Sequence, residues 1–184
     1  MALLEFLRVL RPEKHIAYFP FRILTNPDRS IFDPARFVGT EIPSPDYPDH
    51  ITGCNVVDST NKYTRQVYCC VALVIIGWNG EEYVSALPHI ATDLSSNIYL
   101  LPDDKRRKLV ARHNFRRMIQ TLQHQTDPAT ITTGLVGGNT AKIATAAYYR
   151  RCRDYLSQEL QKSKIPLKIL SPPNTIEGIL SEVY

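Results

Sequence analysis

The sequence contains few cysteines and no long apolar run, and each absence narrows the classes of protein to consider. Among 184 residues the only cysteines are Cys54, Cys69, Cys70 and Cys152. Their spacing fits neither a disulfide framework nor a metal site. We therefore expect a reducing compartment, the cytoplasm, with a secreted effector as the alternative, and we expect no cofactor and no metal. No apolar run approaches the roughly 18 residues that a membrane-spanning helix needs, so we expect no membrane insertion.

Strong charge of one sign is also missing. The formal net charge is +4, which does not by itself require a nucleic-acid partner. The basic side chains of KRRK, with Arg112, Arg116 and Arg117, lie on one face of a predicted helix without interleaved aromatic residues, so we expect no nucleic-acid binding. With 43% hydrophobic and 22% charged residues, the chain has the composition of a folded domain with a sizeable core.

The stretch 64–93 is the part of the chain around which we expect the rest to be arranged. An apolar run over 67–78 breaks at Asn79-Gly80, which is the strongest short-range signal for a β-hairpin with a type I′ turn. In that register Trp78 faces Glu81 and Cys70 lies opposite His89. The two side chains would share one face of the hairpin, with Cα atoms about 5.5 Å apart.

A cysteine beside a histidine is the minimum equipment for thiol nucleophilic catalysis, because the imidazole takes the proton from the thiol. A third side chain normally orients the imidazole, and Thr64 and Asp93 are the local candidates. Cys54, in ITGC, is an alternative nucleophile, since this entry to a strand is similar to one used by some toxin deamidases. The competing interpretation is that Cys70 is only a small apolar residue filling the core.

The remaining chain predicts an α/β or α+β fold: a mixed, β-sandwich-like sheet core that contains the Cys-His hairpin and is covered by two long helices. The first helix should carry an apolar stripe of Leu109, Phe115, Met118, Ile119 and Leu122. Gly137-Gly138 should form a tight turn. The predicted elements are a helix over 103–125, a strand over 129–137, a helix from Asn139 or Thr140 to Lys164, and a strand over 165–171.

Residues 1–50 are expected to be an N-terminal extension of a single compact domain whose main body covers 51–184. The extension should contain a helix over 1–11, a strand over 15–24 interrupted by Pro20, and a proline-rich segment before His50.

The order of these elements resembles the chemoreceptor glutamine deamidase family, CheD. The resemblance covers about residues 63–171, and CVALV, LVGG and IPLKIL are its most specific pieces. It implies a β-sandwich-like hydrolase fold related to toxin deamidases. In that family pattern Cys70 matches the nucleophile, His89 the general base and Thr64 the third member of the site.

The activity that the resemblance implies is hydrolysis of a glutamine side-chain amide to glutamate on a protein substrate, either a chemoreceptor or another glutamine-bearing protein. The alternative is a non-catalytic relative that binds a partner protein through the basic helix or the proline-rich segment.

Overall fold

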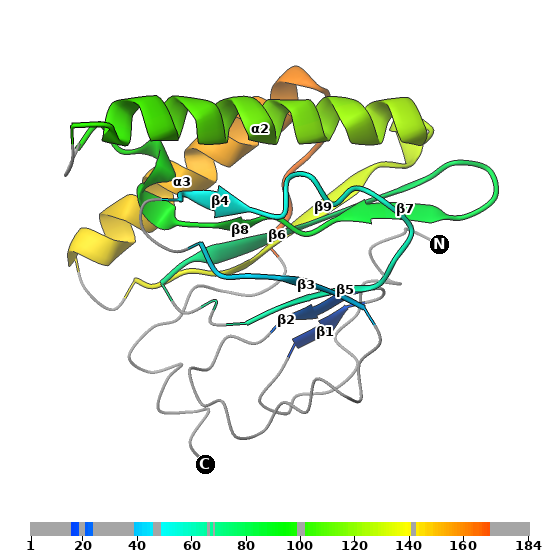
Figure 1. The fold of residues 1–184 in the computed structure, drawn as a ribbon, viewed down its shortest axis with the longest axis horizontal. Helices are drawn as coiled ribbons and strands as arrows, with labels where there is room; N and C mark the ends of the chain where they lie inside the picture. Colours follow the sequence, from blue (N-terminus) through cyan, green and yellow to red (C-terminus); the bar gives the residue numbers. More distant parts are fainter. Residues whose placement is uncertain are drawn as a thin grey trace, which may run out of the picture.

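Helices cover one face of a β-sheet and a second sheet lies against its other face, as the ribbon in Figure 1 shows. The structure is a computed structural model, and it describes residues 16–18, 21–23, 39–45, 49–65, 67, 69–98, 102–140 and 143–169. The predicted α+β class with a mixed sheet and two long helices is confirmed. None of the helices in the described ranges is long and apolar enough to cross a bilayer.

The central strand is β6 (Val71–Trp78), which accounts for the unbroken apolar run of the sequence. It pairs with β7 (Tyr83–Ala86) and β8 (His89–Ile90) on one side and with β9 (Thr132–Gly137) on the other. Alternate residues of β6 belong to two separate buried clusters, one under the helices and one toward the second sheet. A strand buried on both faces has no solvent-facing side, so nearly every position is apolar.

The β6–β7 hairpin has a different turn from the one predicted, and the predicted register is wrong. Trp78 pairs with Tyr83 rather than Glu81, so the loop holds four residues instead of two. The side chain of Asn79 accepts hydrogen bonds from the backbone N–H groups of Glu81 and Glu82, both at 2.8 Å, and this favours the longer loop.

The same shift changes the partner of His89, which lies opposite Ala72 and not opposite Cys70. The displacement is two residues, and side chains alternate between faces with a period of two. If the strand continued, Cys70 would therefore face the same side as Ala72. Cys70, however, precedes the first residue of β6.

The long helices are close to their predicted bounds: α2 covers Asp104–Gln125 and α3 covers Ile143–Lys162. The predicted stripe on α2 is buried except for Leu109, whose side chain is 55% exposed. Lys108 is buried in its place, because its ammonium group has polar partners beneath the helix. The stripe prediction is therefore wrong at Leu109.

Strand β9 begins three residues later than predicted, since Pro128–Thr130 forms a short 3-10 helix, η3. Gly137 and Gly138 both have positive φ, at 85° and 98°, so the tight turn is confirmed and glycine is needed there. Residues 165–169 run beside β9 with a single parallel bridge between Leu135 and Ile169 rather than as the predicted strand. Residues 170 and 171 lie outside the described ranges.

The first sheet, here called sheet B, has the order β4-β8-β6-β7, with β9 on β6, and β4 covers Ile51–Thr52. The second sheet, sheet A, has the order β1-β2-β5-β3. Its strands are β1 (Ile16–Tyr18), β2 (Phe21–Ile23), β3 (Thr40–Ile42) and β5 (Lys62–Thr64).

Three of the four strands of sheet A precede residue 50, so the expected extension contributes to the same sheet as β5. β1 and β2 pair as antiparallel neighbours on either side of Pro20. The helix expected over 1–11 and most of the proline-rich segment lie outside the described residues.

A buried ammonium group joins the two sheets. Lys62 of β5 has no exposed surface, and its Nζ donates to Ser85 Oγ of β7 at 3.0 Å, to Asp58 Oδ1 at 2.7 Å and to the carbonyl oxygens of Asp58 and Thr60. Buried charges are stable only when they are paired and hydrogen-bonded in this way. Lys62 is therefore a polar connection across a largely apolar interface.

We predict that Lys62→Met lowers the free energy of unfolding by about 2–4 kcal/mol, because Asp58 loses its ion pair and the buried Ser85 hydroxyl loses its donor. The measurement is urea denaturation followed by circular dichroism. Lys105→Met removes an exposed lysine of α2 and should change stability by no more than about 0.5 kcal/mol. Equal stability of the two variants would show that the Lys62 contacts contribute nothing to folding.

Candidate functional site

The best-defined polar contact between the sheets joins the threonine and the histidine selected from the sequence. Thr64 is the last residue of β5 in sheet A, and His89 is the first residue of β8 in sheet B. Thr64 Oγ1 and His89 Nδ1 are 2.8 Å apart, and both side chains are fully buried. The histidine therefore points away from the helices and toward sheet A.

The hydrogen bonds of Thr64 determine which nitrogen of His89 carries the proton. The Thr64 hydroxyl has a single hydrogen, and it donates this hydrogen to the carbonyl oxygen of Ile42 at 2.8 Å. Thr64 Oγ1 must then accept from His89, so the proton of the neutral imidazole is on Nδ1. The lone pair is left on Nε2, which is the arrangement that a general base requires.

The environment keeps the imidazole neutral. Burial lowers the pKa of His89 from its ordinary 6.5 to about 4, because the charged form would lose its hydration. His89 Nε2 is buried and has no hydrogen-bond partner. Buried polar atoms without a partner are rare in folded proteins and often mark functional sites.

Cys70 lies directly before β6, next to the strand pair that holds His89. Cys70 itself is in a bend outside the paired strands, and no contact between its thiol and His89 is found among the described residues. Its thiol instead lies close enough to Cys152 of α3, in the cluster under the helices, to raise the pKa of that thiol. The carbonyl oxygen of Cys70 accepts a hydrogen bond from Gly138 N at 2.8 Å. The Gly137-Gly138 turn thereby holds the backbone of the cysteine.

The Cys70 thiol is partly buried, and burial raises its pKa to about 12, with smaller effects from Cys69 and Asp93. At neutral pH the Cys70 thiol and the His89 imidazole are therefore both uncharged. A thiol in this state acts as a nucleophile only when a base removes its proton during the attack.

The alternative nucleophile, Cys54, belongs to a different environment. It packs against the cluster under the helices, whereas His89 bonds to Thr64 on the opposite side of sheet B. Burial raises the pKa of the Cys54 thiol to about 12. Cys152 is fully buried in α3, and burial also raises the pKa of its thiol. Cys69 is exposed.

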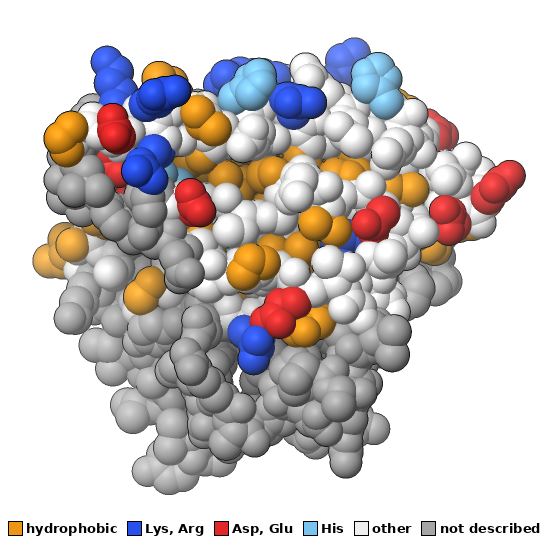
Figure 2. All heavy atoms as spheres, viewed as in Figure 1, with side chains coloured by type: hydrophobic (Ala, Val, Ile, Leu, Met, Phe, Trp, Pro, Cys, Tyr) orange, Lys and Arg blue, Asp and Glu red, His pale blue; other side chains and the backbone are white. Residues whose placement is uncertain are grey.

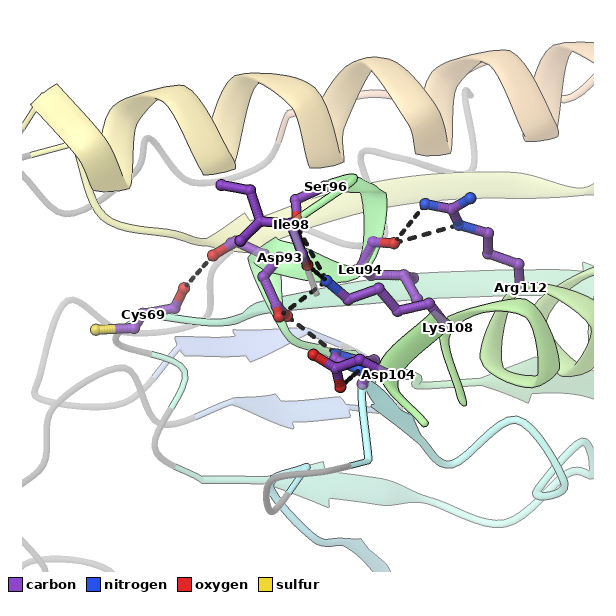
Figure 3. A network of polar contacts seen from close by, with 10 residues as sticks. Cys69, Asp93, Leu94, Ser96, Ile98, Asp104, Lys108 and Arg112 are labelled. Carbon is purple, nitrogen blue, oxygen red and sulfur yellow. Dashed lines mark hydrogen bonds and ion pairs between the residues drawn. The ribbon is translucent and has the colours of Figure 1, made fainter. Parts of the chain in front are cut away.

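Asp93, the other candidate for orienting His89, bonds to a different histidine. Its Oδ1 lies 3.1 Å from His50 Nδ1, and its Oδ2 lies 3.5 Å from Lys108 Nζ. Figure 3 shows the side chains of Asp93, Asp104 and Lys108 converging beneath the start of α2. Asp93 therefore organises the junction of β8, η2 (Thr92–Ser95) and α2, whereas His89 is bonded to Thr64.

This junction was missed by reasoning from the sequence. His50 Nε2 lies 3.4 Å from Asp104 Oδ1, and Lys108 Nζ donates to Ser96 Oγ at 2.9 Å and to the carbonyl oxygen of Ile98 at 2.8 Å. One signal was available, because Lys108 has the helical spacing of the buried stripe. Charged residues are normally assigned to the solvent face, so this signal was not used.

Comparisons of the chain with protein-family models, with curated proteins and with solved structures find no match. Within the described ranges, no group of three or more histidine, cysteine, aspartate or glutamate side chains is placed to hold a metal ion.

The buried histidine should make stability depend on pH. Its pKa is about 4 in the folded chain and 6.5 when exposed, so between these values the unfolded state binds more protons and stability falls as the pH falls. We predict that wild type loses about 3 kcal/mol more than His89→Gln between roughly pH 7 and pH 4. The measurement is urea denaturation across this range. A constant difference between the two proteins at every pH would contradict the prediction.

Proposed function

We propose that this protein is a cysteine-dependent amidohydrolase that converts protein glutamine to glutamate, with Cys70 as nucleophile, His89 as general base and Thr64 as the residue that orients His89. The observation that carries the proposal is the Thr64–His89 hydrogen bond, which leaves a buried, unpartnered Nε2 on the histidine. The resemblance of the sequence to the CheD family supports the same three residues.

The proposed reaction starts from the uncharged pair. As Cys70 Sγ attacks the carbon of the glutamine carboxamide, its proton passes to His89 Nε2, and the carbonyl oxygen becomes an oxyanion. When this intermediate collapses, the C–N bond breaks and the imidazolium protonates the leaving nitrogen, which departs as ammonia. Water, deprotonated by His89, then cleaves the thioester and restores the thiol.

Thr64 has a positioning role in this scheme. Its acceptance of the Nδ1 proton holds the ring in the tautomer that has its lone pair on Nε2, and its own proton is fixed by the Ile42 carbonyl group. As Nε2 becomes protonated, the hydrogen bond from Nδ1–H to Thr64 becomes charge-assisted and therefore stronger. The hydrogen bond to Thr64 therefore stabilises the His89 ring most strongly while the ring holds the transferred proton.

The substrate in this proposal is a protein side chain, because the resemblance is to enzymes that modify chemoreceptors or other proteins. The cytoplasm is the proposed location. All cysteines in the described ranges are free, which supports a reducing compartment.

A second candidate is a non-catalytic, protein-binding relative of this family. It is favoured by the complete burial of His89 and by the pKa of about 12 of the Cys70 thiol, since both describe a closed and unreactive pair. In that case the Thr64–His89 bond would only connect the two sheets.

We predict that Cys70→Ala and His89→Ala each remove nearly all glutamine hydrolysis, because the two residues act as a unit. Thr64→Val should reduce the rate by roughly 10-fold to 100-fold through loss of ring orientation, and Thr64→Ser should restore most of it. The measurement is mass spectrometry of candidate protein substrates, following the gain in mass from glutamine to glutamate.

The control for the nucleophile is Cys54→Ser, which should keep most of the activity. A second readout does not need the natural substrate: peptides carrying a diazo-ketone analogue of glutamine should alkylate Cys70, and His89→Ala should slow this labelling. Labelling of Cys54 instead would move the nucleophile. Failure of a random pool of such peptides to label any cysteine would favour the non-catalytic module.

A further inference from the structure

A groove follows the outer side of α2, on the helix-covered face of sheet B and away from Thr64 and His89. Two adjoining cavities of about 310 and 470 Å³ form it, and they share Ile51 and Asn114 in their walls. One wall is α2 and the other is the segment 49–57, which includes β4. We call this feature the α2 groove.

The length of the α2 groove suits an extended polypeptide. Its lining residues begin at Asp103, just before α2, and end at Gln125, the last residue of the helix. A helix of 22 residues is about 33 Å long, and an extended chain advances about 3.3 Å per residue. About ten extended residues would therefore fill the groove.

The helix wall of the groove is basic. Arg106, Arg107 and Arg117 line it, and all three are exposed. The acidic lining residues, Asp49 and Asp103, occur in the smaller cavity, at the end where α2 begins. The larger cavity has no acidic lining residue among those that the structure describes. Charge complementarity therefore favours an occupant that carries carboxylates.

The remaining lining residues have the chemistry of a peptide site. Ile51, Val57 and Val110 provide apolar surface, and Asn55 and Gln125 provide amide groups that pair with peptide bonds. Figure 2 shows apolar side chains in a band beside the helix that carries the Lys, Arg and His side chains. β4 is the outermost strand in the described part of sheet B, so the groove lies beside an edge strand, and extended peptides commonly bind at such strands.

A nucleic acid would fit this surface less well. No phenylalanine, tyrosine or tryptophan lines either cavity, so single-stranded bases have no stacking platform. Asp49 and Asp103 would also repel phosphate groups at one end. A protein segment with acidic and aliphatic side chains matches both the basic helix wall and the apolar lining residues.

We propose that the α2 groove binds an extended acidic segment of a partner protein, about ten residues long, whose Asp and Glu side chains face Arg107 and Arg117 while aliphatic side chains contact Val110 and Val57. The proposed binding does not involve Cys70 or His89, so it can be tested independently of the proposed hydrolysis.

The test is selection from a random library of ten-residue peptides displayed on phage, panned on the full chain and on the double variant Arg107→Glu/Arg117→Glu. The matched control is Arg150→Glu/Arg151→Glu, which makes the same charge change at exposed positions of α3. Circular dichroism verifies that all three proteins are folded. Fluorescence anisotropy then gives the affinity of the selected peptides and of a single-stranded oligo-dT.

We expect selected peptides to be rich in Asp, Glu and aliphatic residues, and to bind the Arg107→Glu/Arg117→Glu variant at least roughly tenfold more weakly than wild type, with the α3 control within about twofold. Added salt should weaken the binding. The proposal is overturned if no acidic peptide is enriched, if both double variants lose affinity equally, or if oligo-dT binds the groove and the peptides do not.

Discussion

The structure depends on one constraint: β6 is buried on both faces. Residues of opposite parity along this strand pack into two different clusters, so a layer must cover each side. The helices provide one layer, and sheet A provides the other with strands recruited mostly from before residue 50. Because an apolar strand of this kind offers no polar surface, the few polar groups next to it are paired with each other, as Lys62 is with Ser85 and Thr64 with His89.

These two polar contacts explain how a site can form inside a sandwich core. Each joins a residue of β5 to a residue of sheet B, at the two ends of the same short strand. The lysine contact is fully satisfied by oxygen acceptors, whereas the histidine retains a buried nitrogen without a partner. A satisfied contact stabilises the fold, whereas a buried nitrogen without a partner costs stability and marks a position to test for function. This asymmetry separates the structural contact from the candidate catalytic one.

The sequence was sufficient for the class of fold, the bounds of α2 and α3 and the strand β6, because these follow from local periodicity. It was not sufficient for the register at Trp78, since the side chain of Asn79 selects the longer loop through its own hydrogen bonds. Thr64 and His89 were recognisable as candidates, but their contact depends on pairing between distant strands. His50 could not be placed, and the helical spacing of Lys108 did not by itself assign it to the core, because burial of charge is decided by partners that only the folded chain brings together.

The hairpin loop at residues 79–82 also has a consequence for how this chain tolerates changes in length. The loop is two residues longer than the tightest hairpin, and the strands beyond it still present the same residues to each cluster. Residues inserted at the tip would lengthen the loop and leave Trp78 paired with Tyr83, so the side chains of β7 and β8 would keep their faces. No atom lies within 4 Å of a methyl group built on Gly80, so the tip has free space around it. The tip is therefore a suitable place to insert residues or to attach a probe.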